Sequence, residues 1–367
     1  MSGIILCMAN DLENRRRTYS RVSNALAHLD NAQLASLFGE SDRKHGWGGT
    51  HVVTVDGAKV FVKAVPLTDL EFENPYNTRN LYEMPTYYNY GVGSAGLGAY
   101  RELVAQIKTT NWVLEGACPN FPLLYHHRVV PFMGEHSPMD DERRRGYIDY
   151  WGGDAHIERY IVERGRAGHQ IVLCLEHFPN VGYAWLVKKP ELWENVIREL
   201  TEAAAFMRGQ GMVHFDIHFA NVVLDESRPY VADFGLATDK SYHLTDVERR
   251  FLTKHIDYDL AYIVSAVGSF LYSYYRNTPK RNHARLEKLY GITDNYRIAV
   301  AALVENVDAI HDARLIKLDD YYARYVSANR ELILLMFKFF VALRDNHRKD
   351  TAYPSARVRR LLNPPPV

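Results

Sequence analysis

Residues 213–237 of the chain read VHFDIHFANVVLDESRPYVADFGLA, and this stretch decides the fold. It predicts a strand after Asn221, a turn at residues 225–229 and a second strand that ends at Asp233. Asp216 and Asn221 share the loop before this hairpin, and the hairpin returns Asp233 toward that loop. Three oxygen-bearing side chains are therefore expected to converge at the strand ends.

Such oxygens suit a divalent metal ion. Carboxylate and amide oxygens are preferred by hard cations, and Mg²⁺ is usually held by one or two carboxylates together with substrate phosphates. Turn-forming polar residues would explain Asp216 and Asn221 taken alone. The hairpin and the Asp-Phe-Gly sequence that begins at Asp233 favour instead a metal site that serves a nucleotide.

The same residues resemble two linked motifs of the protein kinase family. Residues 214–221 are similar to the catalytic loop H-R-D-x-x-x-x-N, and residues 233–235 match D-F-G. The resemblance implies that Asp216 accepts the proton of an acceptor hydroxyl. It further implies that Asn221 and Asp233 hold Mg²⁺ and that ATP is the phosphoryl donor.

A glycine-rich stretch lies far upstream, at residues 46–53, and opens a predicted hairpin with an Asp-Gly turn at residues 56–57. It resembles the kinase loop G-x-G-x-x-G-x-V, with His51 in place of the third glycine. In such a loop the missing side chains let backbone N–H groups approach phosphates. The resemblance implies nucleotide contacts for four residues: Gly46, Gly48, Gly49 and Val53.

The second strand of that hairpin ends in Val-Phe-Val-Lys and resembles the kinase motif V-A-I-K, which implies that Lys63 contacts the α- and β-phosphates. Apolar neighbours such as Val62 and Ala64 argue against a merely exposed lysine. Phe61 stands where the family has a small alanine above the adenine, so it either narrows the pocket or shifts the ring.

Lys63 needs a partner carboxylate. We select Glu102, in the predicted helix at residues 100–108, as the counterpart of the glutamate on the family's helix C. It lies 39 positions beyond Lys63, so three other carboxylates remain competitors: Glu71, Glu73 and Glu83.

Two further segments resemble kinase elements. Residues 175–178, Leu-Glu-His-Phe, close an apolar strand and are similar to the hinge, which implies adenine contacts for the Glu176 carbonyl and the Phe178 N–H. Asp259 opens an apolar helix and fits the family's helix F aspartate, which anchors the catalytic loop; a simple helix N-cap is the alternative.

Two further positions depart from the kinase pattern. Phe215 replaces the arginine that receives an activation-loop phosphate in many kinases, and no A-P-E motif follows Gly235, so control by phosphorylation of that segment is not expected. His218 stands where serine/threonine kinases typically have lysine; aminoglycoside phosphotransferases and haspin resemble the chain there, and His218 is counted as a candidate catalytic residue.

The composition is that of an ordinary folded protein of 367 residues, with 47% hydrophobic and 24% charged residues. Lys plus Arg equals Asp plus Glu at 44 each, so no net field attracts nucleic acid or an anionic membrane. Three cysteines without metal-ligand spacing and the lack of a long apolar run predict a cytoplasmic protein without a membrane span.

The predicted fold is α+β: a bilobal kinase-like fold with a small antiparallel β lobe plus a helix, then a larger, mainly helical lobe. Its expected parts are a helical N-terminal extension at 1–40 with a break at residues 30–31, an N-lobe at 41–178 with insertions near 67–98 and 133–168, a C-lobe at 179–350 and a tail at 351–367.

The favoured function is transfer of the γ-phosphate of Mg-ATP to a serine or threonine of a protein. Asp-Phe-Gly favours this acceptor, whereas His218 favours a small-molecule hydroxyl. A pseudokinase that only binds partners is a third hypothesis, which the joint presence of Lys63, Asp216, Asn221 and Asp233 opposes. Adenylyl transfer from ATP also remains open.

Overall fold

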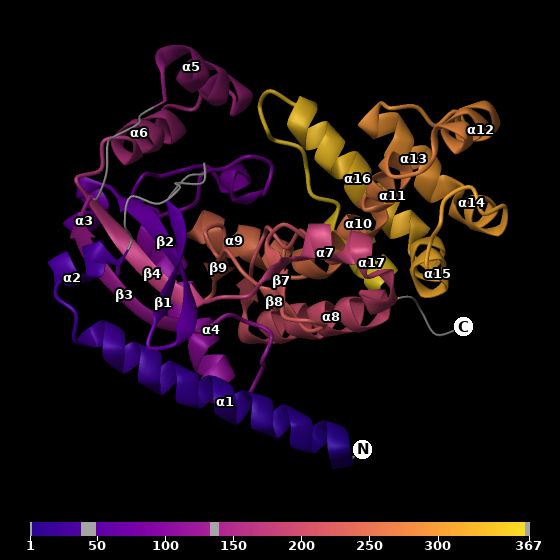
Figure 1. The fold of residues 1–367 in the computed structure, drawn as a ribbon. Helices are drawn as coiled ribbons and strands as arrows, with labels where there is room; N and C mark the ends of the chain where they lie inside the picture. Colours follow the sequence, from indigo (N-terminus) through magenta and orange to yellow (C-terminus); the bar gives the residue numbers. More distant parts are fainter. Residues whose placement is uncertain (1, 38–48, 133–138, 364–367) are drawn as a thin grey trace. The chain divides into compact units, whose positions relative to one another are not determined.

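The computed structural model describes residues 2–37, 49–132 and 139–363. The chain divides into two compact units, the first made of Met1–Phe178 and Ala232–Arg249, the second of Pro179–Val231 and Arg250–Val367. An antiparallel four-stranded sheet with helices forms the N-terminal part, and a larger, mainly helical C-terminal part follows it (Figure 1). The expected α+β class is therefore confirmed, while the functional boundaries of the predicted lobes stay a prediction.

The sheet of the first unit contains four strands: β1 Thr50–Val55, β2 Ala58–Leu67, β3 Leu124–Pro131 and β4 His169–Glu176. Their order is β1-β2-β4-β3, and neighbours are antiparallel. Asp56 and Gly57 link β1 to β2 with positive φ angles of 46° and 75°, as a tight two-residue hairpin turn requires. The sequence analysis missed β3, because the polar residues at 126–128 interrupt its apolar pattern.

Helix α4, Ala99–Leu114, packs on this sheet and extends beyond the range predicted for it. Their common core contains apolar side chains from α4 and from β2, β3 and β4. Its buried members are Val65, Leu67, Ala99, Tyr100, Leu103, Leu124, Ile171, Leu173 and Leu175. Burial of this apolar surface fixes the helix against the sheet and so fixes every polar side chain that α4 presents beside it.

The N-terminal extension forms two helices, α1 Ser2–Ala27 and α2 Asn31–Ser36. The predicted break is correct, since Asp30 accepts the N–H of Gln33 and starts α2 as its N-cap. Helix α1 contacts β1, β3 and α4 (Figure 1). The extension is therefore part of the first unit.

The first predicted insertion contains little regular structure, and the described part of the second contains more. The first has α3 Asp69–Phe72 and the 3-10 helix η1 Thr86–Asn89, and the described part of the second has α5 Asp141–Tyr150 and α6 Ala155–Arg164. The ring of Trp151 lies 4.7 Å from that of Tyr88 and 5.3 Å from that of Tyr150. The tyrosines of the first insertion thus pack against the second. That both are insertions into a kinase fold stays a prediction.

The second unit is built around α10, Tyr258–Ser269, which packs on α16, Arg330–Asp345, and on α8, Trp193–Gln210. A Cβ at Gly268 would lie only 2.3 Å from Cγ2 of Ile333, so glycine is required where α10 and α16 approach closely. The other helices of this unit are α7 Gly182–Lys188, η2 Pro190–Leu192, α11 Leu271–Arg276, α12 Lys280–Tyr290, α13 Tyr296–Glu305, α14 Val307–Asp312, α15 Asp320–Ala328 and α17 Ser355–Leu362.

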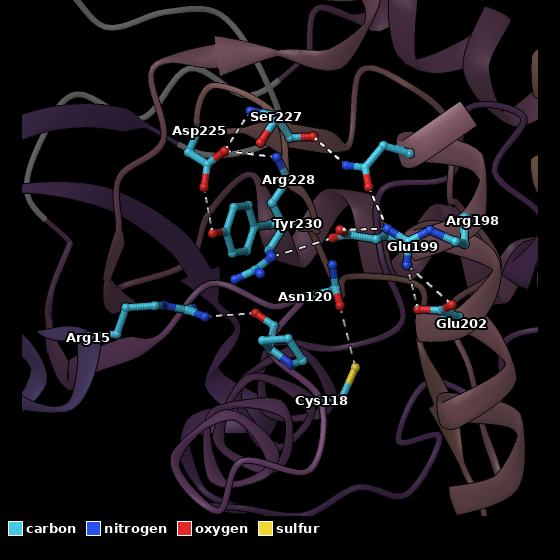
Figure 2. Close-up of polar contacts among 12 residues, drawn as sticks. Arg15, Cys118, Asn120, Arg198, Glu199, Glu202, Asp225, Ser227, Arg228 and Tyr230 are labelled. Carbon is cyan, nitrogen blue, oxygen red and sulfur yellow. Dashed lines mark hydrogen bonds and ion pairs between the residues drawn. The ribbon is translucent and has the colours of Figure 1, made fainter. Parts of the chain in front are cut away.

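A small antiparallel sheet of this unit joins β5 Asn180–Val181, β7 Val222–Leu224 and β8 Pro229–Val231. Asp225 fixes the turn between β7 and β8, because its carboxylate accepts the N–H groups of Ser227 and Arg228 and the hydroxyl of Tyr230 (Figure 2). The predicted strand-turn-strand is therefore present. The short strands β6 Met212–Val213 and β9 Thr238–Asp239 and helix α9 Asp246–Lys254 complete the chain.

Within the described residues, no helix is both long and apolar enough to cross a membrane.

Candidate functional site

The first unit brings three of the predicted site residues together. The Lys63 Nζ lies 2.6 Å from Oε1 of Glu102 and 2.8 Å from Oδ1 of Asp233. Lys63 stands on β2 and Glu102 on the first turn of α4, so sheet and helix packing sets their separation. We call these three residues the lysine triad. Its Glu102 side chain is 6% exposed and its Asp233 side chain 48% exposed, so the triad is open to solvent on the side of Asp233.

Glu71, a competitor for the role of Glu102, has another task. Its carboxylate accepts the N–H and hydroxyl of Thr68, which closes a capping box on α3, and it also accepts the N–H of Ala99 at the start of α4. Gly98 precedes α4 with a φ of 120°, and a Cβ there would lie 3.3 Å from Oε1 of Glu71. Glu71 therefore fixes the beginning of the helix that presents Glu102.

Electrostatics keep Lys63 charged. Burial by itself would lower the pKa of Lys63, but the negative charges of Asp233 and Glu102 outweigh that effect and hold the pKa above its ordinary value. Burial raises the pKa of the Glu102 carboxyl, and the charge of Lys63 opposes this rise. The result is an ammonium group that stays protonated at neutral pH beside a partly exposed carboxylate.

The backbone at Asp233 and Gly235 is constrained beside the other two residues of the triad. Asp233 has a positive φ of 64°, which is unusual for a residue with a side chain and is often found at functional sites. A Cβ on Gly235 would lie 3.4 Å from both Oδ1 of Asp233 and Oε2 of Glu102, and its carbonyl accepts the N–H of Leu97. Glycine at 235 leaves room for the two carboxylates.

The segment at residues 236–249 is held to α4 by buried ion pairs. Arg101 contacts Glu248 at 2.7 Å, with the two side chains 2% and 7% exposed. Lys108 contacts Asp239 at 2.6 Å, and the Asp239 side chain is fully buried. The hydroxyl of Tyr242 donates to the carbonyl of Arg101. The sequence analysis missed these pairs, since their partners lie more than 130 positions apart and no spacing rule connects them.

The second unit holds the other predicted residues in one loop. The Asn221 amide donates to Oδ2 of Asp216 at 2.9 Å and to its backbone carbonyl at 3.1 Å. The Nε2 of His218 lies 3.5 Å from Oδ1 of Asp216. The Asn221 nitrogen makes both bonds, so its amide oxygen takes no part in this contact with Asp216. The loop thus holds a carboxylate, an imidazole and an amide side by side.

The carboxylate of Asp259 anchors this loop through backbone hydrogen bonds. Asp259 on α10 accepts the N–H of His214 at 2.7 Å and that of Phe215 at 3.0 Å, which is the contact that the resemblance implies for helix F. Burial raises the pKa of Asp259 to about 7, although the two N–H donors act in the opposite direction. Asp257 has a different role, since it forms ion pairs with Arg208 and Arg359.

Phe215 packs where many kinases have an arginine. Its ring is fully buried and lies 5.1 Å from that of Tyr258 and 5.4 Å from that of Phe251. His255 stacks on Phe251 at 3.9 Å and on Tyr353 at 4.5 Å. We call these five residues the aromatic stack. Phe215 also has a positive φ of 67°, which the stack and Asp259 together impose on the residue before Asp216.

The expected nucleotide loop is described only in part. Gly46 and Gly48 lie outside the described residues. Gly49 accepts the N–H of Ala64 through its carbonyl, and Val53 pairs with Val60 across the hairpin. Both therefore lie on or beside β1, next to the strand of Lys63.

The predicted hinge ends β4. The backbone N–H of Glu176 donates to the carbonyl of Leu123, and its carboxylate forms an ion pair with Arg15 of helix α1. Phe178 is the last residue of the first unit's main segment. Sequence reasoning missed Arg15, because an arginine run at residues 15–17 on a helix usually marks a solvated face.

Each unit contains one predicted metal ligand with an oxygen donor of the kind that Mg²⁺ prefers. In the described ranges, no group of three or more His, Cys, Asp and Glu side chains is placed to hold a metal by itself. Mg²⁺ needs only one or two protein carboxylates when phosphate oxygens supply further ligands. Asp233, with its half-exposed carboxylate, and Asn221, with its amide oxygen, have this chemistry.

Comparison with known proteins finds a partial similarity. The chain is 32% identical over 98 residues to the protein named eIF-2-alpha kinase GCN2 of Schizosaccharomyces pombe. The match covers 26% of this chain and 6% of that protein. No protein-family model matches the chain. Over about a quarter of its length the chain is similar in sequence to that kinase, and a sheet followed by a helical part agrees with a kinase-like fold.

Proposed function

We propose that the chain is an ATP-dependent phosphotransferase that moves the γ-phosphate of Mg-ATP to a hydroxyl group. The observation that most supports this is the lysine triad, in which Lys63 contacts both Glu102 and Asp233. A lysine held charged between two carboxylates suits phosphate oxygens as a further partner. The similarity to a kinase over 98 residues supports the same reaction class.

Each residue receives a role in this proposal. Lys63 binds the α- and β-phosphates, and Glu102 orients it. Asp233 and Asn221 hold Mg²⁺, which neutralises charge on the β- and γ-phosphates. The acceptor oxygen attacks the γ-phosphorus, the bond between that phosphorus and the ADP oxygen breaks, and Asp216 accepts the hydroxyl proton.

A serine or threonine of a protein is the favoured acceptor, on the ground of the Asp-Phe-Gly sequence at 233–235. A small-molecule hydroxyl is the second candidate, favoured by His218, whose ring lies beside Asp216. In this proposal the imidazole contacts the γ-phosphate or the acceptor, and its side chain is shorter than that of a lysine. The two acceptors predict different products from the same donor.

The test uses the purified full chain with Mg²⁺ and ATP that is labelled either at the α- or at the γ-phosphate. A degenerate serine/threonine peptide library and a panel of aminoglycosides serve as acceptors, and Asp216→Asn serves as the control. Magnesium-dependent transfer of the γ label that disappears in Asp216→Asn supports the proposal. Transfer of the α label indicates adenylyl transfer, and no transfer of either label indicates a binding module; both results contradict it.

A further inference from the structure

Helix α1 inserts an arginine into the polar end of the sheet. The guanidinium of Arg15 binds the carboxylate of Glu176 through two bonds, at 3.0 Å and 2.6 Å. It also donates to the carbonyls of Pro119 and Phe121, both at 2.7 Å. The two partner side chains are only 7% and 12% exposed. The pair is bidentate and almost buried, so loss of either partner would leave the other charge desolvated, unlike in a surface salt bridge.

The neighbouring arginine binds the other element of the candidate site. Arg16 donates two bonds to the carbonyl of Leu114, the last residue of α4, which also presents Glu102. A cation at this helix end satisfies an unpaired carbonyl and complements the helix dipole. In return, Arg128 of β3 donates to the carbonyls of Leu26 and Leu29 at the end of α1. Helix α1 is thereby tied at both the strand and the helix of the first unit.

We propose that Arg15 is a positioning residue for the nucleotide base, acting through Glu176. The inference rests on the proposed function. Glu176 has its carboxylate bound by Arg15 and by the N–H of Leu123, and its own N–H bound by the Leu123 carbonyl. These bonds fix the backbone N–H and the side chain of Glu176, and its backbone carbonyl is the group expected to meet the adenine. The N-terminal extension is thus part of the base-binding edge.

The structure explains why Arg15 affects the base and not the phosphates. The residues proposed to bind the phosphates lie on β2 and on the first turn of α4, whereas the described hydrogen bonds of Arg15 go to Glu176, Pro119 and Phe121. Loss of Arg15 leaves the Glu176 carboxylate with fewer donors, so it turns toward water and takes the end of β4 with it. A smaller affinity for any ligand that contains adenine follows, whether or not the ligand has phosphates.

The experiment compares adenosine with Mg-ATP by titration calorimetry on the full chain, well below its melting temperature. For Arg15→Gln we expect both dissociation constants to rise by the same factor, about tenfold, as the loss of a charged hydrogen bond predicts. Glu176→Gln should do the same, and the double variant should be no weaker than either single one. Lys63→Met should weaken Mg-ATP and leave adenosine unchanged. Arg17→Gln is the matched control, because Arg17 lies on the same helix and its exposed side chain contacts only Glu13 in the described contacts.

Three results would overturn the inference. A lower melting temperature of Arg15→Gln with unchanged affinities means that Arg15 only stabilises the fold. Weaker Mg-ATP binding with unchanged adenosine binding means that it acts on the phosphates. Failure of the wild-type chain to bind either ligand refutes the proposed function itself, and this outcome is distinguishable because it does not depend on any variant.

Discussion

The two units hold their site residues by different forces. In the first unit, buried opposite charges fix the lysine triad and the segment at 236–249 to α4. In the second unit, two backbone hydrogen bonds to Asp259 and the aromatic stack fix the loop that contains Asp216. At Phe215 the second unit has packed aromatic rings and not an ion pair.

This difference determines how much stability each unit loses on mutation. A buried ion pair needs both partners, since removal of one leaves a desolvated charge that is very costly. A ring stack loses only contact area when one ring shrinks, so its losses are smaller and graded. In neither unit does a described contact depend on a phosphorylated side chain. Constitutive activity with respect to phosphorylation of the segment at 236–249 therefore stays our prediction.

The largest effect is expected in the first unit. Arg101→Leu leaves Glu248 buried without its guanidinium partner, and we expect the free energy of unfolding to fall by about 3–5 kcal/mol in urea denaturation. Adding Glu248→Gln removes the charge while keeping an acceptor for Thr245, and should restore most of the loss. Arg297→Leu, which breaks an exposed pair of the second unit, is the control with a much smaller effect. Equal losses for the buried and exposed pairs would refute this comparison.

The second effect concerns pH and His255, the imidazole of the stack. Burial lowers the pKa of His255 to about 4 from its ordinary 6.5, so the unfolded chain binds the proton first as pH falls. The wild type should therefore lose stability between about pH 6.5 and pH 4, by on the order of 3 kcal/mol, relative to His255→Phe. The measurement is the free energy of unfolding of both proteins across this range. Parallel pH profiles would mean that His255 is not buried in its neutral form.

The smallest effect on stability is expected for Phe215→Leu, which keeps an apolar side chain in the stack. The smaller side chain should cost about 2 kcal/mol through lost burial and a residual cavity. Turnover should fall while nucleotide affinity stays unchanged, because Phe215 directly precedes Asp216, the proposed acceptor of the hydroxyl proton. Stability and both kinetic constants are measured on the same preparation. A loss of nucleotide affinity with unchanged turnover would contradict the assignment of Phe215 to the loop of Asp216.

The sequence predicted what local patterns encode. The hairpin at β1 and β2 follows from apolar alternation around Asp56-Gly57, and the cap at Asp30 follows from residue type alone. The partner of Lys63 was selected from four glutamates by resemblance, and only the fold separates Glu102 from Glu71, which caps α4 instead.

Contacts between distant segments were beyond such patterns. The pairs of Arg101 with Glu248 and of Arg15 with Glu176 join residues that look like solvated helix charges in the sequence. Helices α5 and α6 were missed because their many charged residues suggest an irregular insertion, although α6 buries Ile157, Tyr160 and Ile161 on one face and Trp151 between the two helices is completely buried. Tertiary packing decides these features, and one sequence does not reveal it.

The most direct test of the account separates the two halves of the reaction. Asp233→Ala in the first unit and Asp216→Asn in the second are compared for Mg-ATP affinity by calorimetry and for γ-phosphate transfer. We expect that Asp233→Ala loses magnesium-dependent binding, while Asp216→Asn binds Mg-ATP normally and loses turnover by a factor of about 100 or more. Parallel loss of binding and turnover in Asp216→Asn, or unchanged Mg-ATP binding in Asp233→Ala, would contradict it.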